Sequence, residues 1–365
     1  MSKKVLIVTD FFEPHKSGIV TYISQLIDSL KNNNCEITVL TTRFNNKISK
    51  IENLNGVKII RCKPFLKISR GFYSIDLVFK YIKLYKKFDI VNLHLPLVEI
   101  FPIIFFLKRK QTNINYHCLP EFPIILKFVK FYFYFFGICA SLISKKTIVL
   151  SKDYFNNILF HNIIKKKIIE IPPYILLPNK YNKRNIEKNS IKIGYLGRLS
   201  DEKGLEILIE ASNKLLKNKY DHELIIAGDK EDKRFQKYIK KLFYKSKNNN
   251  RIKFIGKINE LDKSKFLNNL DIFILPSINS FEAFGIVQLE AMSYGIPVLA
   301  SNIIGVRSII KKTKNGFLFE NKNIDDLYEK ILLCNITKFN AINIRKNLEK
   351  TYNKEIFNSK VLNSF

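Results

Sequence analysis

The stretch that decides the fold is DIFILPSINSFEAFGIVQLEAMSYGIPVLAS, residues 271–301. Its opening apolar run ends at Pro276, which predicts a buried strand followed by a loop. The apolar stripe from Val287 to Met292 predicts a helix, which Pro297 cannot continue. The apolar residues after Pro297 predict the next strand. A strand, a loop, a helix and a second strand in this order are typical of an α/β sheet.

Two carboxylates flank the turn into this helix. Glu282 lies in the loop, and Glu290 follows about two helical turns later. The turn itself is Gly285, Ile286 and Val287, whose backbone N–H groups at a positive helix end can bind phosphate. A carboxylate beyond a phosphate site can accept hydrogen bonds from a ribose. The alternative is a solvated pair of glutamates on an ordinary α/β unit.

The seven-residue spacing of Glu282 and Glu290 resembles the E-x7-E signature of the retaining glycosyltransferases of family 4. The resemblance covers nearly the whole chain and is strongest in residues 191–320. It implies the α/β fold called GT-B, in which two doubly wound Rossmann-like domains face each other across a cleft. The expected bounds are 1–175 for an N-terminal acceptor-side domain, 176–190 for a linker, 191–340 for a C-terminal nucleotide-sugar-binding domain, and 341–365 for C-terminal helices that cross back to the first domain.

A pair of cations lies at the end of the strand predicted at residues 191–199 and just after it. Arg198 lies at the strand end, and Lys203 lies five residues later at a helix entry. A planar guanidinium fork and a compact ammonium together suit a diphosphate. The pattern resembles the family's G-R-L…K-G motif, which implies that both residues neutralise the leaving diphosphate. The alternative is two surface cations in a lysine-rich chain. The same resemblance places Lys257 and Ile258 near the nucleotide base.

The N-terminal segment predicts a strand, a loop and a helix with Gly18 at the helix entry. This arrangement suits phosphate. It resembles the family's N-terminal loop, which carries two adjacent glycines, although Ser17 replaces the first of them here. The alternative is an ordinary helix-entry glycine. The opening apolar run is short and ends at Asp10, which predicts a strand and not a signal peptide.

Two histidines end predicted strands in the first half of the chain. His94 ends the strand predicted from residue 89, and His117 ends the strand predicted from residue 113. Ligands of open α/β sheets lie outside the carboxyl ends of strands, so both are expected at the edge of a cleft. The resemblance implies that His117 lies near the donor sugar and is catalytic. A structural histidine at a strand end is the alternative.

The resemblance implies transfer of a hexose-type sugar from a nucleotide diphosphate donor to a saccharide acceptor, with retained anomeric configuration. We expect a lipid-linked acceptor in surface polysaccharide or lipopolysaccharide synthesis. Arg198, Lys203 and the helix N–H groups would stabilise the leaving diphosphate, and Glu282 would hold the sugar. The sequence has no visible metal-ligand cluster, so neither a metal nor another cofactor is expected. A nucleotide-sugar epimerase or a phosphorylase with the same fold is the alternative.

The chain of 365 residues has a net charge of +30. Residues 1–185 hold 30 Lys and Arg against 11 Asp and Glu, a net charge of +19. Such a field favours anionic lipid surfaces, nucleic acid or phosphorylated substrates, although lysine-rich composition alone would also produce it. A nucleic-acid-binding protein stays a remote alternative, because no recognisable motif of that class is present. We therefore do not expect nucleic acid as a partner.

The segment 131–144 is rich in aromatic residues and carries no charge. It is too short to span a membrane, which needs about 20 apolar residues. With Lys127 and Lys130 before it, it predicts either a core helix or an interfacial helix whose lysines meet lipid phosphates. The five cysteines are scattered, which is typical of reduced thiols in a cytoplasmic protein. We therefore expect a cytoplasmic protein associated peripherally with the inner face of the cell membrane; the alternative is a soluble acceptor and a charge that only reflects composition.

Overall fold

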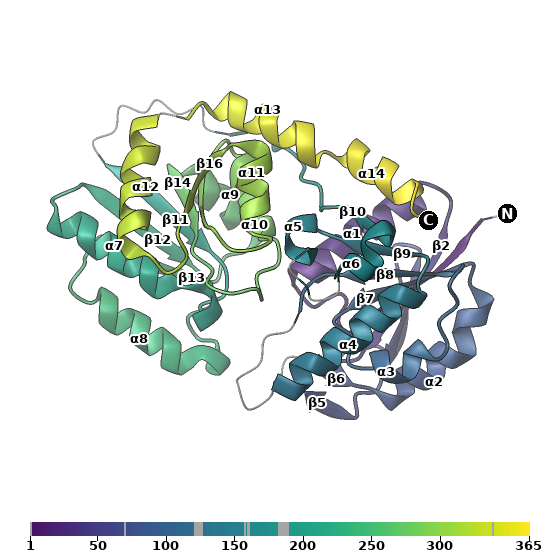
Figure 1. Ribbon diagram of the computed structural model, residues 1–365. Coiled ribbons are helices and arrows are strands. Elements are labelled where there is room, and N and C mark those ends of the chain that lie inside the picture. Colours follow the sequence, from purple (N-terminus) through teal and green to yellow (C-terminus); the bar gives the residue numbers. More distant parts are fainter. Residues whose placement is uncertain are drawn as a thin grey trace. The chain divides into compact units, whose positions relative to one another are not determined.

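The computed structural model describes residues 2–68, 71–119, 127–156, 158, 161–181, 190–337 and 339–365. The chain divides into two compact units, each with its own sheet (Figure 1). The first unit comprises Met1–Pro173 together with Glu355–Phe365, and the second comprises Tyr174–Lys354. Residues 182–189 of the expected linker and 122–126 before the aromatic segment lie outside the described residues.

The first unit is built on a sheet with the strand order β10-β9-β8-β7-β1-β2-β4-β3. Its strands are β1 (Lys4–Thr9), β2 (Glu36–Thr42), β3 (Ile51–Leu54), β4 (Val57–Cys62), β7 (Ile90–Leu95), β8 (Thr112–Tyr116), β9 (Lys146–Val149) and β10 (Ile168–Glu170), and a separate hairpin joins β5 (Leu66–Ile68) to β6 (Gly71–Tyr73). Its helices are α1 (Gly18–Lys31), α2 (Ile75–Leu84), α3 (Ile100–Ile104), α4 (Lys127–Ile143), α5 (Lys152–Phe155), α6 (His161–Ile164) and α14 (Lys354–Leu362), with single 3-10 turns η1 (Tyr85–Lys87) and η3 (Lys165–Lys167).

The strands of this sheet run parallel, except that β3 is antiparallel to β4. Val5 of β1 is paired with Ile37 of β2 on one side and with Ile90 of β7 on the other. The chain therefore adds β2, β3 and β4 on one side of β1, and later adds β7 to β10 on the other side. Ligands of open α/β sheets bind outside the carboxyl ends of the strands where the order reverses, here β1 and β7.

The hairpin β3–β4 was not anticipated from the sequence. Its turn is Asn55-Gly56, and both residues have positive φ, 50° and 77°. Asn-Gly is the most favourable pair for such a two-residue hairpin turn, because both residues tolerate the left-handed region. This dipeptide is the sequence signal that could have predicted the hairpin.

The second unit has a parallel sheet with the strand order β13-β12-β11-β14-β15-β16. Its strands are β11 (Ile191–Leu196), β12 (His222–Ala227), β13 (Ile252–Gly256), β14 (Ile272–Leu275), β15 (Val298–Ser301) and β16 (Gly316–Phe319). Its helices are α7 (Leu205–Lys217), α8 (Gln236–Ser246), α9 (Glu260–Asn268), α10 (Ile286–Ser293), α11 (Arg307–Thr313), α12 (Ile324–Thr337) and α13 (Ala341–Tyr352), with 3-10 turns η4 (Asp201–Lys203) and η5 (Lys233–Phe235). The strand order reverses between β11 and β14. Helices α7 and α12 lie side by side (Figure 1), and their buried leucines and isoleucines pack with those of the sheet.

The two C-terminal helices belong to different units. Helix α13 packs against α10 and α11 of the second unit. Helix α14 belongs to the first unit, where Phe357 packs edge-on against Tyr22 of α1 with ring centroids 5.8 Å apart. Asn113 of β8 donates a hydrogen bond to the carbonyl of Ser364 at 3.1 Å. The structure confirms the α/β class and the doubly wound sheets expected from the sequence.

Candidate functional site

Two loops of the second unit meet at the carboxyl ends of β11 and β14, where the strand order reverses. The N–H of Ile278 donates to the carbonyl of Glu202 at 3.0 Å and joins the loop after β14 to η4. Gly204 follows η4 with φ of +64°, and a Cβ added there would lie 2.1 Å from the carbonyl oxygen of Pro276. Only glycine fits both this conformation and this contact. The two loops are thus held together by their backbones.

Lys203 and Glu282, two of the predicted site residues, form an ion pair at this junction. Lys203 ends η4, and Glu282 lies in the loop that enters α10. Their side chains are only 15% and 16% exposed, so the pair is largely removed from water. Neither charge would be stable there alone, because an unpaired buried charge is costly. An anionic or hydroxylated substrate that contacts either group would therefore compete with its partner.

Arg198 lies beside this pair, at the end of β11. Its Nη2 is 3.2 Å from Oε1 of the buried Glu202, and its guanidinium lies 5.8 Å from the ring centroid of Phe281. The hydroxyl of Tyr195 donates to the Arg198 carbonyl at 2.7 Å. These contacts hold the backbone and the planar head of Arg198 in place. Sequence reasoning missed Glu202 and Phe281, although Phe281 directly precedes the first glutamate of the signature.

The turn into α10 is built around Gly285. Gly285 has φ of +80°, and a Cβ there would lie 2.6 Å from Cδ2 of Leu275, so this position also requires glycine. Helix α10 begins at Ile286, and the N–H of Gln288 in its first turn donates to the Gly285 carbonyl at 3.0 Å. The N–H groups of Ile286 and Val287 precede any intrahelical acceptor and can face an anion. The buried Gln288 donates to two backbone carbonyls, at 3.1 and 3.2 Å, and fixes the turn. The predicted anion site is therefore rigid and follows directly after the loop of Glu282.

Glu290 lies further along α10 and is paired with a lysine of α9. Its Oε1 is 2.9 Å from Nζ of Lys263, which also contacts Glu260 at 2.7 Å. Burial works against the charge of Lys263, but Glu290 and Glu260 outweigh it and raise the pKa of Lys263 above its ordinary value. A ribose that binds Glu290 would share this carboxylate with Lys263. The sequence analysis did not include Lys263, because α9 is remote from the signature in the chain.

Lys257 and Ile258 follow β13, the edge strand of the sheet. Lys257 is exposed and Ile258 is half-buried. The loops before them are stacked, because Gly228 donates to the carbonyl of Gly256 at 2.9 Å. A Cβ on Gly228 would lie 2.3 Å from the carbonyl oxygen of Gly197, so the loop after β12 lies tightly against the loop after β11. The described hydrogen bonds and ion pairs do not join Lys257 or Ile258 to the Lys203–Glu282 pair.

Gly18 and His117 lie in the first unit. Gly18 is the exposed first residue of α1, and the hydroxyl of Ser17 accepts the N–H of Val20 at 3.3 Å. This cap satisfies one of the helix N–H groups that a phosphate could otherwise bind. Gly18 has no positive φ, so its conformation does not require glycine.

His117 is buried in the first unit and only 3% exposed. Its Nε2 lies 2.8 Å from Nδ1 of His94, and the ring of Tyr22 packs edge-on against it. Burial lowers the pKa of His117 to about 3, and burial together with His117 holds the pKa of His94 well below its ordinary range. Both rings are therefore neutral at pH 7. Sequence reasoning expected these residues at a cleft edge, whereas the structure shows them packed together, and the catalytic role of His117 stays a prediction.

A pair of buried carboxyls lies where the first sheet reverses its order. Asp10 directly follows β1, and Glu99 directly precedes α3 after β7. Asp10 accepts the N–H of Phe72 at 3.3 Å, and Glu99 accepts the N–H of Ser74 at 2.6 Å, so both hold the chain of β6. Burial raises the pKa of Asp10 to about 7. Burial and the nearby Asp10 carboxyl raise the pKa of Glu99 to about 8. The sequence analysis did not predict this pair. The sequence feature that could have indicated it is Asp10, an acidic residue directly after the first strand.

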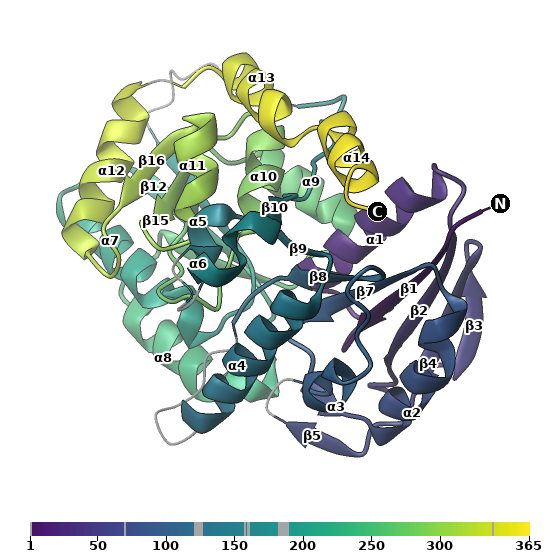
Figure 2. The same ribbon diagram turned by 45° about the vertical axis from the view of Figure 1, so that its right-hand side comes forward.

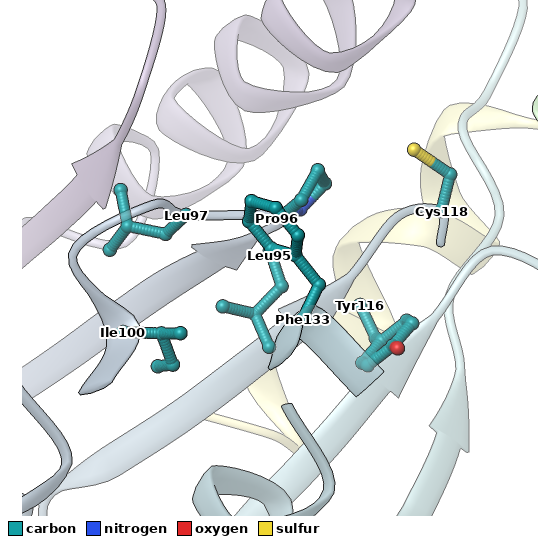
Figure 3. Close-up of a pocket in the computed structure, with 7 residues that line it drawn as sticks. All are labelled: Leu95, Pro96, Leu97, Ile100, Tyr116, Cys118 and Phe133. Atoms are coloured by element: carbon teal, nitrogen blue, oxygen red, sulfur yellow. The ribbon is translucent and has the colours of Figure 1, made fainter. Parts of the chain in front are cut away.

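A small apolar pocket lies between β7, β8 and α4 of the first unit (Figure 3). Leu95, Leu97, Tyr116 and Phe133 contribute to its lining, and its volume is about 10 Å³. This is room for about one water molecule, so the pocket is not a sugar site. Within the described residues, no group of His, Cys, Asp and Glu side chains is arranged to hold a metal ion.

Residues 178–348 match the sequence model of the family described as glycosyl transferases group 1. The matched segment covers a little under half of the chain and is similar to glycosyltransferases of this group. It lies entirely within the second unit and contains the Lys203–Glu282 pair, Arg198 and Glu290.

Two curated relatives extend this likeness. An uncharacterized glycosyltransferase of Methanocaldococcus jannaschii is 26% identical and aligns with 89% of this chain and 87% of its own length. The capsular polysaccharide biosynthesis glycosyltransferase CapM of Staphylococcus aureus is 28% identical over 42% of this chain and 39% of its own length.

Solved structures resemble the whole chain. Sucrose-phosphate synthase from Thermosynechococcus elongatus has a TM-score of 0.78 at 16% identity, covering 99% of this chain and 98% of its own. HepE of Anabaena, in complex with UDP and glucose, has a TM-score of 0.73 at 18% identity, covering 99% of each chain. The lipopolysaccharide outer core galactosyltransferase WaaB has a TM-score of 0.72 at 20% identity, covering 99% of this chain and 100% of its own. These likenesses confirm the expected GT-B fold.

Proposed function

We propose that this protein transfers a hexose-type sugar from a nucleotide diphosphate donor to a saccharide acceptor with retained anomeric configuration. The observation that carries the proposal is the Lys203–Glu282 ion pair beside Arg198, at the reversal of the second sheet. This position is where α/β sheets bind ligands. The positive end of α10 follows directly in the chain.

The leaving diphosphate is the first chemical problem in such a transfer. Arg198, Lys203 and the N–H groups of Gly285, Ile286 and Val287 supply positive charge and hydrogen-bond donors to it. When the donor binds, the diphosphate would take Lys203 away from Glu282. That exchange frees the Glu282 carboxylate to hold sugar hydroxyls and to stabilise positive charge that develops at the anomeric carbon.

The nucleotide would extend from the diphosphate toward α9 and the edge of the sheet. Glu290 would accept the ribose hydroxyls while keeping its contact with Lys263. The backbone at Lys257 and Ile258 would lie along the base, because β13 ends at the same edge of the sheet as β11. HepE, which shares the fold, has been solved with UDP and glucose; we infer UDP or GDP as the leaving group here.

The acceptor is proposed to be a lipid-linked saccharide at the cytoplasmic face of the membrane. CapM is named for capsular polysaccharide and WaaB for the lipopolysaccharide outer core, which supports a role in surface polysaccharide synthesis. The net charge of +19 on residues 1–185 also favours an acceptor displayed at an anionic surface.

A panel of UDP- and GDP-sugars tests this proposal through thermal unfolding. A ligand at 100 times its dissociation constant adds about 2.7 kcal/mol to the free energy of unfolding, so the true donor should raise the melting temperature clearly. The donor found in this way is then incubated with lipid extracts, and the anomeric configuration of the product is read by NMR. Stabilisation by no nucleotide sugar, or a product of inverted configuration, would contradict the proposal.

A further inference from the structure

Helix α4 is apolar on its outer side as well as on its inner side. Helices on the surface of soluble proteins normally carry polar residues outward. The exposed residues of α4 instead include Phe128, Phe131, Phe135 and Leu142, which are 69%, 62%, 47% and 39% exposed. Their spacing places them on one side of the helix. Because these side chains stay exposed, packing within the described residues does not explain why the outer side of α4 is apolar.

Helix α3 extends the same surface. Phe101 and Phe105 of α3 are 45% and 73% exposed, and α3 packs beside α4 (Figure 2). The rings form a continuous series of contacts. Their centroids are 5.5 Å apart for Phe105–Phe101, 4.9 Å for Phe101–Phe136, 5.2 Å for Phe136–Phe135 and 5.8 Å for Phe135–Phe131. We call the exposed side chains of Phe101, Phe105, Phe128, Phe131, Phe135 and Leu142 the α3–α4 face.

Cations without carboxylate partners gather at the C-terminal end of α4. Lys167 Nζ donates to the carbonyl of Ser144 at 2.9 Å, and burial together with the nearby charge of Arg109 lowers the pKa of Lys167. Lys145 directly follows this end of the helix and is exposed. In the described part of the chain, no salt bridge joins Arg109, Lys145 or Lys167 to an acidic side chain. These cations therefore have room for an external anion.

Basic residues also outnumber acidic residues in the sequence around the α3–α4 face. The basic residues of segment 100–146 are Lys108, Arg109, Lys110, Lys127, Lys130, Lys145 and Lys146, whereas Glu121 is its single acidic residue. Exposed aromatic rings bordered by cations are typical of segments that lie in the interface of a membrane. A contiguous apolar patch on a soluble surface also generally marks an interaction site.

We propose that the α3–α4 face docks on an anionic lipid bilayer. The phenyl rings enter the boundary between headgroups and acyl chains, and the neighbouring lysines and Arg109 meet lipid phosphates. A second copy of this chain fits the face less well, since a symmetric contact would bring like charges together. No helix of the described residues is long and apolar enough to cross a bilayer, and the proposed contact needs none. The inference rests on the proposed function in one respect, because it locates the lipid-linked acceptor.

A tryptophan reporter tests the contact directly, because the chain contains no tryptophan. Phe131→Trp places one on the face, and Tyr244→Trp on α8 is the matched control, since Tyr244 is 69% exposed in the second unit. With vesicles of phosphatidylcholine and phosphatidylglycerol, emission at position 131 should shift to the blue and be quenched by brominated lipid. Emission at position 244 should not change. Equal emission at position 131 with and without anionic vesicles would overturn the proposal.

Vesicle co-sedimentation then separates the apolar and electrostatic contributions. Phe131→Ser with Phe135→Ser, and separately Arg109→Glu with Lys145→Glu, should each weaken binding by about tenfold or more, and salt should weaken wild-type binding. The control for charge is Lys217→Glu with Lys311→Glu, two exposed lysines of the second unit, which should bind nearly as wild type does. If both charge variants lose the same affinity, net charge and not this face is responsible, and the proposal fails.

Two further measurements distinguish the remaining outcomes. Sedimentation velocity without lipid would show a dimer that Phe131→Ser with Phe135→Ser dissociates if the face were an interface between copies, which would contradict lipid docking. Thermal stabilisation by nucleotide sugars, measured without vesicles, reports on donor binding and not on the α3–α4 face. Retained stabilisation with no vesicle binding would reject the docking surface and leave the transferase proposal standing, whereas the opposite result would reject the transferase proposal alone.

Discussion

Lys203 and Glu282, 79 positions apart in the chain, form an ion pair at the carboxyl ends of β11 and β14. Each charge is the principal partner of the other in a region that is largely closed to water. The pair therefore couples the residue proposed to bind the diphosphate to the residue proposed to bind the sugar. Donor binding would exchange this contact for two contacts with substrate.

Removing either cation at the junction should slow turnover. Lys203→Ala or Arg198→Ala should reduce kcat by about 100-fold or more, the scale of losing one donor to a developing oxyanion. Initial rates at saturating donor measure this. Lys203→Ala should also lower the free energy of unfolding, because it leaves Glu282 without its cation, and the double variant Lys203→Ala/Glu282→Ala should recover part of that loss. Wild-type turnover in either single variant would remove that residue from the mechanism.

Replacing the two glutamates of the signature should affect different steps, nucleotide binding for Glu290 and turnover for Glu282. Glu290→Ala should weaken binding of the free nucleoside diphosphate by about 1.5–3 kcal/mol, the worth of a hydrogen bond to a charged group. Glu282→Ala should mainly lower kcat, because it contacts the sugar. Calorimetry with the nucleotide and steady-state kinetics measure the two effects. Lys263→Ala is the control, since it frees Glu290 without removing it. If it weakens the nucleotide as much as Glu290→Ala does, the ion pair and not the ribose contact is responsible.

Gly204→Ala should destabilise the second unit and disturb the ion pair. A non-glycine residue at φ of +64° is strained, at a cost of about 1–3 kcal/mol, and the added Cβ would collide with the Pro276 carbonyl 2.1 Å away. Urea unfolding should therefore show a larger loss than Gly256→Ala, where φ is +78° but the nearest atom to the added Cβ is 3.9 Å away. Equal losses in the two variants would mean that the contact between the loops contributes nothing.

The buried carboxyls of the first unit should make stability fall as pH rises. Unfolded Asp10 and Glu99 lose their protons near pH 4, whereas the folded protein holds them up to about 7 and 8. The folded state binds more protons between these values, so its stability decreases by about 1 kcal/mol per pH unit for each group that titrates. Between pH 6.5 and 9, Glu99→Gln should flatten this decrease. An unchanged slope in urea unfolding would show that Glu99 is already ionised in the folded protein.

Transfer should proceed without a divalent ion. Arg198, Lys203 and the start of α10 are proposed to supply the charge that a metal would otherwise provide to the diphosphate. Rates measured with EDTA and with added Mg²⁺ should agree within about twofold. Loss of activity in EDTA, restored by Mg²⁺, would assign the diphosphate to a bound ion in place of these residues.

The sequence by itself determined the α/β class and the elements that carry the signature. Buried parallel strands are continuous apolar runs, and glycine at Gly285 and Gly204 is required by local backbone conformation, so these features can be read locally. The family resemblance also implied that Arg198, Lys203 and Glu282 would serve one site. The Asn55-Gly56 hairpin was equally local, and it was missed only because the dipeptide was overlooked.

The tertiary structure alone decided which charges are paired and which groups lose water. The pairing of Glu290 with Lys263 depends on how α9 packs beside α10, and the pairing of Lys203 with Glu282 depends on how η4 meets the loop after β14. The burial of His117 against His94 also depends on packing, since both strand ends were expected to be open. The series of exposed rings over α3 and α4 required the two helices to lie side by side. Pairing and burial are set by contacts between segments distant in the chain, and residue type and spacing do not specify those contacts.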